Sequence, residues 1–315
     1  MPKRGFFATV RSFLFRVQRW KFMLAARVLP QRTAASGAAL FCTPLRPATA
    51  KLQVDDTVPT PRLRQISLAS GTVTLYEWGD SARRPTILLL HGWNGWGLQF
   101  AAFVAPLLAR GFAVVALDQR GHGRSAGRYA SLPGFIATAR ELLACLPNLT
   151  GLVGHSLGAA AAACTVAQID KPQLQLVLIA PPTHPRVFLE KFAALMGIPA
   201  ALVDAMQQWM ERRFATPFAQ VGVDQVAPSI QTRTLVIHDA GDQVVPIAHG
   251  ARYVELIQGA RLASLQGYGH VRILQAPDAI RQTVAFLAEG ATLEQAPPNV
   301  TPGAAAPAAL TRAVA

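Results

Sequence analysis

One short segment of the sequence has the residue types and spacing of a serine nucleophile. Residues 154–158 read Gly-His-Ser-Leu-Gly, directly after the apolar pair Leu152-Val153 and before an Ala-rich stretch. In a sharp turn from a strand into a helix, the two glycines avoid side-chain clashes, so the hydroxyl of Ser156 can stand exposed. The pattern is common by chance, but the strand before it and the helix after it favour a nucleophile elbow.

A serine hydroxyl needs a base to take its proton, and the base needs a third group to fix its tautomer. Asp242 and His270 each lie just past the end of an apolar segment typical of a strand, and the chain order is serine, aspartate, histidine. We predict His270 as general base and Asp242 as the acid that orients it. A surface-loop histidine is the alternative for His270, and Asp239 competes for the acid role, although its place at the strand end favours shaping the loop.

The oxyanion of a tetrahedral intermediate needs two amide donors. The amide of Leu157, which follows the nucleophile, is the first predicted donor. The second is predicted at Trp93, within residues 91–95 (His-Gly-Trp-Asn-Gly), because this loop also follows an apolar strand. We expect His91 to buttress the loop without transferring protons.

Residues 118–125 (Asp-Gln-Arg-Gly-His-Gly-Arg-Ser) look like a phosphate-binding glycine loop. The segment lacks the Lys-Ser/Thr ending of a P-loop and the full spacing of a dinucleotide fingerprint. We interpret it as a tight turn in which Asp118 and Arg120 make local pairs.

Apolar segments alternate with helical patterns from Gly71 onward, which predicts a mostly parallel sheet covered by helices on both faces. The predicted strands are 74–78, 86–91, 113–118, 151–155, 175–180, 234–239 and 261–266. The predicted helices include 99–110, 157–169 and 277–288. We expect the folded domain to span residues 67–292.

A helical insertion over residues 183–230 interrupts the alternation and predicts a small lid. Its Met206, Trp209 and Met210 are candidates to line an apolar acyl pocket. The alternative is that they pack the lid onto the body. After it, residues 293–315 form an Ala/Pro-rich segment that we predict to be a disordered tail.

The positive charge is concentrated at the N-terminus. The chain has a net charge of +13, yet residues 1–66 carry 12 Lys/Arg against 2 Asp/Glu. Within the N-terminal segment 1–33, residues 6–28 have the spacing of a basic amphipathic helix, and 34–66 are predicted to be a linker. The helix predicts peripheral contact with an anionic membrane; packing on its own domain, or a mobile tail, is the alternative.

The three cysteines show no disulfide or zinc-binding spacing, so we expect a cytoplasmic protein without a metal. No apolar run is long enough to predict a spanning helix. The near-neutral body gives no reason to expect nucleic acid as a partner.

Together the His-Gly-x loop, the Asp-x-Arg-Gly-x-Gly-x-Ser turn and the Gly-His-Ser-x-Gly elbow resemble the α/β-hydrolase superfamily, and specifically its esterase, lipase and acylhydrolase branch. The resemblance covers about residues 70–290. It implies an α/β fold with a mostly parallel sheet of about eight strands, the triad Ser156, Asp242 and His270, oxyanion donors at Trp93 and Leu157, and no cofactor. Dehalogenases and epoxide hydrolases of this fold carry aspartate where this chain has Ser156, which disfavours both activities.

The sequence therefore predicts a serine hydrolase that cleaves a carboxylic ester or thioester of a small to medium acyl group. One alternative is a C–C bond hydrolase on the same triad. Another is a membrane-associated binding protein without turnover, although such a protein gains nothing from keeping the triad and both donors.

Overall fold

The computed structural model describes residues 3–45, 58–171 and 173–290. The predicted tail at 293–315 and residues 46–57 of the predicted linker lie outside these residues.

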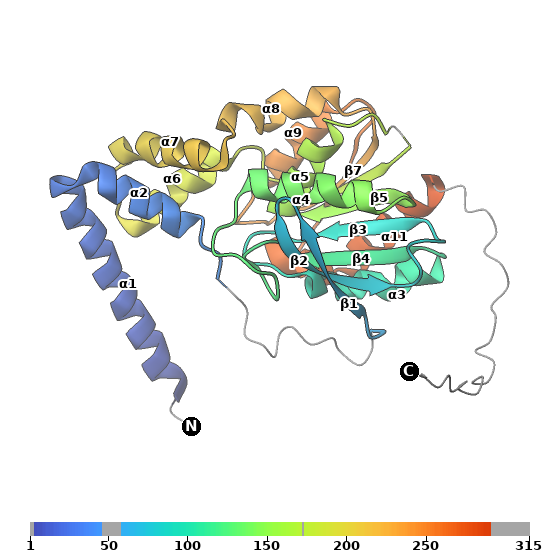
Figure 1. Cartoon of the computed structure of the whole chain (residues 1–315), viewed down its shortest axis with the longest axis horizontal. Coiled ribbons are helices and arrows are strands. Elements are labelled where there is room, and N and C mark those ends of the chain that lie inside the picture. Colours follow the sequence, from blue (N-terminus) through green and yellow to red (C-terminus); the bar gives the residue numbers. More distant parts are fainter. Residues whose placement is uncertain (1–2, 46–57, 172, 291–315) are drawn as a thin grey trace, which may run out of the picture.

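An eight-stranded sheet forms the centre of the molecule, in the order β1-β2-β4-β3-β5-β6-β7-β8 (Figure 1). Two neighbouring pairs are antiparallel, β1 with β2 and β2 with β4. In the sheet order given, each neighbouring pair from β4 to β8 is parallel. The strands are β1 (Arg62–Leu68), β2 (Gly71–Trp78), β3 (Thr86–Leu90), β4 (Ala113–Asp118), β5 (Leu149–His155), β6 (Gln175–Ile179), β7 (Arg233–Asp239) and β8 (Arg261–Leu265). The predicted fold class is confirmed.

Helices cover both faces of the sheet, as the alternating pattern predicts. On one face, α4 (Leu132–Cys145), α5 (Leu157–Val166) and α9 (Ile247–Leu256) share a core with the strands. On the other face, α3 (Ala101–Ala109) and α11 (Pro277–Gly290) enclose a second core. Strands buried on both faces carry continuous apolar runs, which is why β3, β4 and β6 were readable from sequence.

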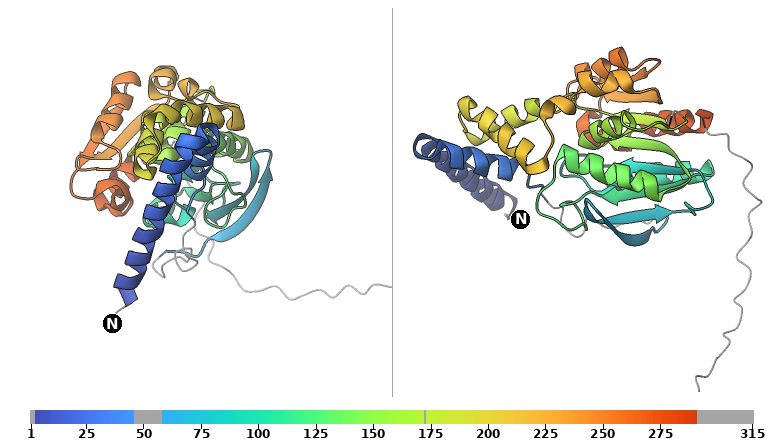
Figure 2. Two further views of the ribbon diagram at one scale, coloured as in Figure 1. Left: turned by 90° about the vertical axis from the view of Figure 1, so that its left-hand side faces the viewer. Right: turned by 45° about the horizontal axis from the view of Figure 1, so that its top comes forward.

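The insertion between β6 and β7 contains α6 (Pro185–Met196), α7 (Val203–Phe214) and the short helix α8 (Val223–Val226). It occupies the residues predicted as a lid. α7 packs against the N-terminal helix α2 (Pro30–Phe41; Figure 2). The insertion and the N-terminal segment therefore share one apolar cluster.

The prediction of a linker over residues 34–66 is wrong at both ends. Residues 34–41 belong to α2, and β1 begins at Arg62. α2 escaped prediction because its buried positions are small residues, with little apolar periodicity to read. At Gly37 an added Cβ would lie 2.6 Å from the Ile198 side chain, so the small residue permits close packing. β1 escaped because it is a largely exposed edge strand with alternating polar residues.

α1 (Lys3–Val28) precedes α2 and projects beside the insertion (Figures 1 and 2). After α2 the chain crosses to the body as a strap, residues 42–45. The amide of Ala130 donates to the carbonyl of Cys42 at 2.8 Å, and the Leu45 amide donates to Asn94 Oδ1 at 2.7 Å. Over the ranges that the structure describes, no helix combines the length and the apolar character that crossing a membrane requires.

Candidate active site

Ser156 lies in a strained turn between β5 and α5. Its backbone has φ 51° and ψ −122°, a conformation that non-glycine residues rarely adopt. The flanking glycines make the turn feasible, because a Cβ on Gly154 would lie 2.5 Å from Ala159 Cα and one on Gly158 would overlap the carbonyl oxygen of Leu90. The turn leaves the Ser156 side chain partly exposed.

A chain of two hydrogen bonds joins the three residues predicted as a triad. Ser156 Oγ lies 3.0 Å from His270 Nε2, and His270 Nδ1 lies 2.7 Å from Asp242 Oδ2. Ser156 directly follows β5, Asp242 lies in the loop after β7, and His270 lies in the short helix after β8. All three therefore lie past the carboxyl ends of parallel strands. An Nδ1–H donated to Asp242 leaves Nε2 as the acceptor for the serine proton.

The surroundings of Asp242 keep it ionised. Its Oδ1 accepts hydrogen bonds from the amides of Val244 at 2.8 Å and Val245 at 2.9 Å. Burial alone would raise the pKa of Asp242, but interactions with His238, His270 and the Val245 amide outweigh burial and hold the pKa well below its ordinary value. An ionised carboxylate here stabilises a protonated His270.

Among the described residues, Asp239, the competitor for the acid role, forms no hydrogen bond with His270. Its Oδ1 accepts from the Gly241 amide at 2.9 Å and its Oδ2 from the Tyr268 amide at 2.8 Å. Asp239 therefore ties together the two loops that carry Asp242 and His270.

The two amides predicted as oxyanion donors flank the serine. Leu157 is the first residue of α5, and a Cβ on Gly92 would lie 2.9 Å from Ser156 Cβ, which places the Trp93 loop beside Ser156. Among the described residues, no protein group accepts a hydrogen bond from the Trp93 or Leu157 amide. Both N–H groups are therefore available to a substrate oxygen.

Other side chains hold the Trp93 loop in place. Nε2 of His91 accepts from the Gln119 amide at 2.9 Å, so its Nδ1–H donates to the Gly92 carbonyl at 2.7 Å. Burial lowers the pKa of His91 to about 4, which keeps the ring neutral and suits the expected buttressing role. Asn94 stands at φ 56° and is tied to the strap through its Oδ1.

His155, which the sequence reasoning did not single out, contacts His270. Its Nε2 donates to the carbonyl oxygen of His270 at 2.8 Å, and the two ring centroids lie 4.8 Å apart. Burial, together with the charge of His270, lowers the pKa of His155 to about 3, so the ring is neutral. The only sequence signal was its variable position in the elbow, which carries no information on this long-range contact.

The loop over residues 118–125 is structural. Asp118 accepts from the Gly97 amide at 2.7 Å, the Arg124 amide at 2.7 Å and the Tyr76 hydroxyl at 2.8 Å. Arg120 donates to the Ser70 carbonyl at 3.2 Å. These contacts pin the loop to β2 and to the turn before α3.

The structure gives Met206 and Met210 a packing role, which differs from the predicted substrate contact. Both are buried in the cluster between α7 and α2, where the methyl group of Met206 faces Gly37. Trp209 is partly exposed and packs edge-on against Tyr129, with ring centroids 6.4 Å apart. A substrate contact stays a prediction for Trp209 alone.

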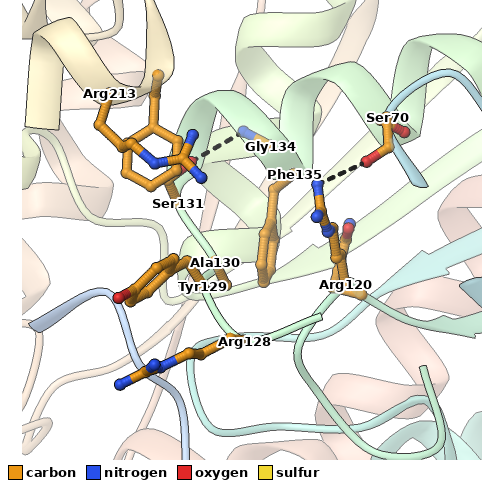
Figure 3. Close-up of a pocket in the computed structure, with 11 residues that line it drawn as sticks. Ser70, Arg120, Arg128, Tyr129, Ala130, Ser131, Gly134, Phe135 and Arg213 are labelled. Carbon is orange, nitrogen blue, oxygen red and sulfur yellow. Dashed lines mark hydrogen bonds between the residues drawn. The ribbon is translucent and has the colours of Figure 1, made fainter. Parts of the chain in front are cut away.

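A cavity of about 320 Å³ opens between the loop after β4, the start of α4 and the end of α7 (Figure 3). Arg120, Arg128 and Arg213 are among its lining residues, whereas none of the predicted triad or oxyanion residues lines it. The cavity is therefore separate from the serine centre. In the described part of the chain, no group of three His, Cys, Asp or Glu side chains is placed to hold a metal ion.

Comparison with known proteins agrees with this fold. Residues 85–222 match the family model for the alpha/beta hydrolase fold. A non-heme chloroperoxidase of Burkholderia pyrrocinia is 25% identical, covering 62% of this chain and 87% of its own. A bifunctional esterase/perhydrolase of Acinetobacter calcoaceticus is 26% identical, with the same two coverages of 62% and 87%.

Among solved structures, a membrane phospholipase A superposes with a TM-score of 0.56 at 18% identity, over 91% of this chain and 99% of that one. Other neighbours cover 71–73% of this chain, so that structure also matches parts outside the central body. The eight-stranded sheet and the family model over residues 85–222 show that this chain has the α/β-hydrolase fold, and its relatives support a hydrolase activity.

Proposed function

We propose that this protein is a serine hydrolase that cleaves a carboxylic ester or thioester of a small to medium acyl group. The observation that carries the proposal is the hydrogen-bonded series Ser156–His270–Asp242. The Trp93 and Leu157 amides beside the serine, for which the described residues provide no acceptor, support it. A binding protein has no need of a serine held in a strained conformation within hydrogen-bond distance of a histidine.

The proposed reaction has two halves. Ser156 Oγ attacks the substrate carbonyl while His270 Nε2 takes its proton, and the Trp93 and Leu157 amides bind the developing oxyanion. His270 then returns the proton to the departing alkoxide or thiolate as its bond to the carbonyl carbon breaks. The acyl group remains on Ser156 as an acyl-serine. Water, deprotonated by His270, attacks the acyl-serine and releases the acid and the serine hydroxyl.

The names of the relatives favour one second candidate, perhydrolysis. One relative is a bifunctional esterase/perhydrolase. Hydrogen peroxide in place of water would take the acyl group from Ser156, forming a peroxy acid and restoring the serine hydroxyl. This activity uses the same acyl-serine and requires no further residue.

C–C bond hydrolysis has less support. A ring-opened aromatic acid requires a cation near the serine for its carboxylate. Arg213, an arginine of the insertion, lines the separate cavity of Figure 3.

The test is turnover of p-nitrophenyl esters from acetyl to palmitoyl by the wild type, Ser156→Ala and the control Ser67→Ala, whose serine is exposed on β1. We expect Ser156→Ala to lose at least about a thousandfold in kcat/KM and Ser67→Ala to be unaffected. Adding hydrogen peroxide and assaying peroxy acid tests the second candidate. Equal activity in the wild type and Ser156→Ala, or none in either, would reject the ester mechanism.

A further inference from the structure

The C-terminal half of α1 turns its apolar stripe away from the protein. Trp20, Leu24 and Val28 follow one another at four-residue spacing and are 63%, 56% and 77% exposed. Leu29, just after the helix, is 48% exposed. A helix that serves only to cover its own domain buries this stripe, so the observed orientation leaves a large apolar face in need of a partner.

Contacts on the opposite side of α1 fix this orientation. The Arg19 guanidinium donates to the carbonyls of Ala194 and Leu195, at 3.1 Å and 2.8 Å, in the last turn of α6. Cations bind favourably at helix C-termini, where carbonyls lack partners. Phe22 is buried in the cluster shared by α2 and the insertion. α1 is thus docked on the insertion through Arg19 and Phe22, with its apolar stripe outward.

The charges beside the stripe select the partner. Arg16, Lys21 and Arg27 are exposed on the same part of α1, and the first acidic residue of the chain is Asp55. A second copy of α1 would bring cations against cations. An anionic bilayer instead offers negative headgroups for the basic side chains and an apolar boundary for tryptophan and leucine.

We propose that this face of α1, formed by Trp20, Leu24, Val28, Arg16, Lys21 and Arg27, docks the protein on an anionic lipid bilayer. The helix lies in the interface, with its apolar stripe in the headgroup region. From there α2 and the strap lead directly to Asn94 in the Trp93 loop.

A consequence for substrate choice follows, and it rests on the proposed ester hydrolysis. Docking through α1 holds the insertion and the Trp93 loop close to the bilayer. Acyl esters that reside in a lipid surface are therefore the substrate class that this arrangement favours.

The experiment is sedimentation of the full chain with phosphatidylcholine vesicles, with or without about one-third phosphatidylglycerol. We expect binding to the anionic vesicles at least about tenfold stronger than to neutral ones, and weakened by salt. The double variant Trp20→Ser/Leu24→Ser loses at least about tenfold of this binding. The matched control Leu63→Ser, whose leucine is 49% exposed on β1, keeps it.

Three results would overturn the docking proposal. They are equal binding by the double variant, equal binding to neutral vesicles, and a lipid-free dimer that the double variant converts to a monomer, which would assign the face to a second copy. Hydrolysis of p-nitrophenyl butyrate by the same variants separates the two proposals. Vesicle binding without any esterase activity contradicts the proposed function alone, and full activity without vesicle binding contradicts the docking alone.

Discussion

Asp242→Asn tests the proposed triad at the residue whose surroundings most constrain the outcome. Oδ1 of Asp242 accepts from the Val244 and Val245 amides. The new amide NH₂ cannot face these two donors, so it takes the place of Oδ2, which lies 2.7 Å from His270 Nδ1. There it donates to Nδ1, which forces the ring proton onto Nε2. His270 then presents a donor to Ser156 and cannot accept its proton.

The expected loss is large because the variant keeps its fold but holds the wrong tautomer. The same substitution in a serine protease triad lowers kcat by about 10⁴, and at 1.36 kcal/mol per factor of ten this equals roughly 5.5 kcal/mol. We expect a fall of about 10⁴ in kcat for p-nitrophenyl butyrate, with little change in KM. The assay is steady-state kinetics on protein whose melting temperature matches that of the wild type.

Asp239→Asn is the matched control. Within the described part of the chain, the Asp239 carboxylate accepts hydrogen bonds from the backbone amides of Gly241 and Tyr268 and from no other group. We therefore expect less than about a tenfold loss of kcat and a free energy of unfolding lower by about 1–3 kcal/mol. If Asp242→Asn kept activity within tenfold of the wild type, or Asp239→Asn lost more than Asp242→Asn, the assignment of the acid would be refuted.

Three further predictions concern the supporting residues. Gly158→Ala places a Cβ against the carbonyl that ends β3, so we expect a melting temperature lowered by several degrees, whereas Gly134→Ala, with ordinary space around its Cβ position, leaves thermal melting nearly unchanged. His155→Phe removes the donor to the His270 carbonyl, and we expect kcat to fall about tenfold. His155→Gln keeps a donor and should recover part of the lost kcat. If His155→Phe and His155→Gln had the same kcat, a positioning role for this hydrogen bond would be excluded. Burial lowers the pKa of His91 from 6.5 to about 4, so between these pH values only the unfolded chain binds a proton on His91. The free energy of unfolding therefore falls by about 1.4 kcal/mol per pH unit as the pH drops from 6.5 to about 4. Urea titrations at several pH values should show a weaker dependence of this free energy on pH in His91→Gln.

The sequence predicted the parts of this fold that local chemistry controls. Continuous apolar runs in the sequence indicate the buried parallel strands. The elbow at Ser156 could be predicted because only glycines fit at positions 154 and 158 on either side of it. The positions of Asp242 and His270 follow from strand ends, since parallel strands of one sheet bring their carboxyl ends to the same edge.

Long-range packing could not be predicted in the same way. Small residues around Gly37 gave no periodic signal, although they let α2 pack closely on α7. Because most of α2, the helix that buries Met206 and Met210, was predicted to be a linker, both methionines were predicted to line a pocket. The hydrogen bond between His155 and the His270 carbonyl joins residues 115 apart in sequence, and no local pattern encodes it.

The most direct test of the central claim is covalent labelling of the activated serine. A fluorophosphonate reacts with a serine hydroxyl that a histidine deprotonates, and peptide mass spectrometry locates the adduct. The account predicts one adduct, on Ser156, that is absent in Ser156→Ala and forms at least about a hundredfold more slowly in His270→Ala. Labelling of another residue at an unchanged rate in Ser156→Ala, or no labelling of the folded wild type, would contradict it.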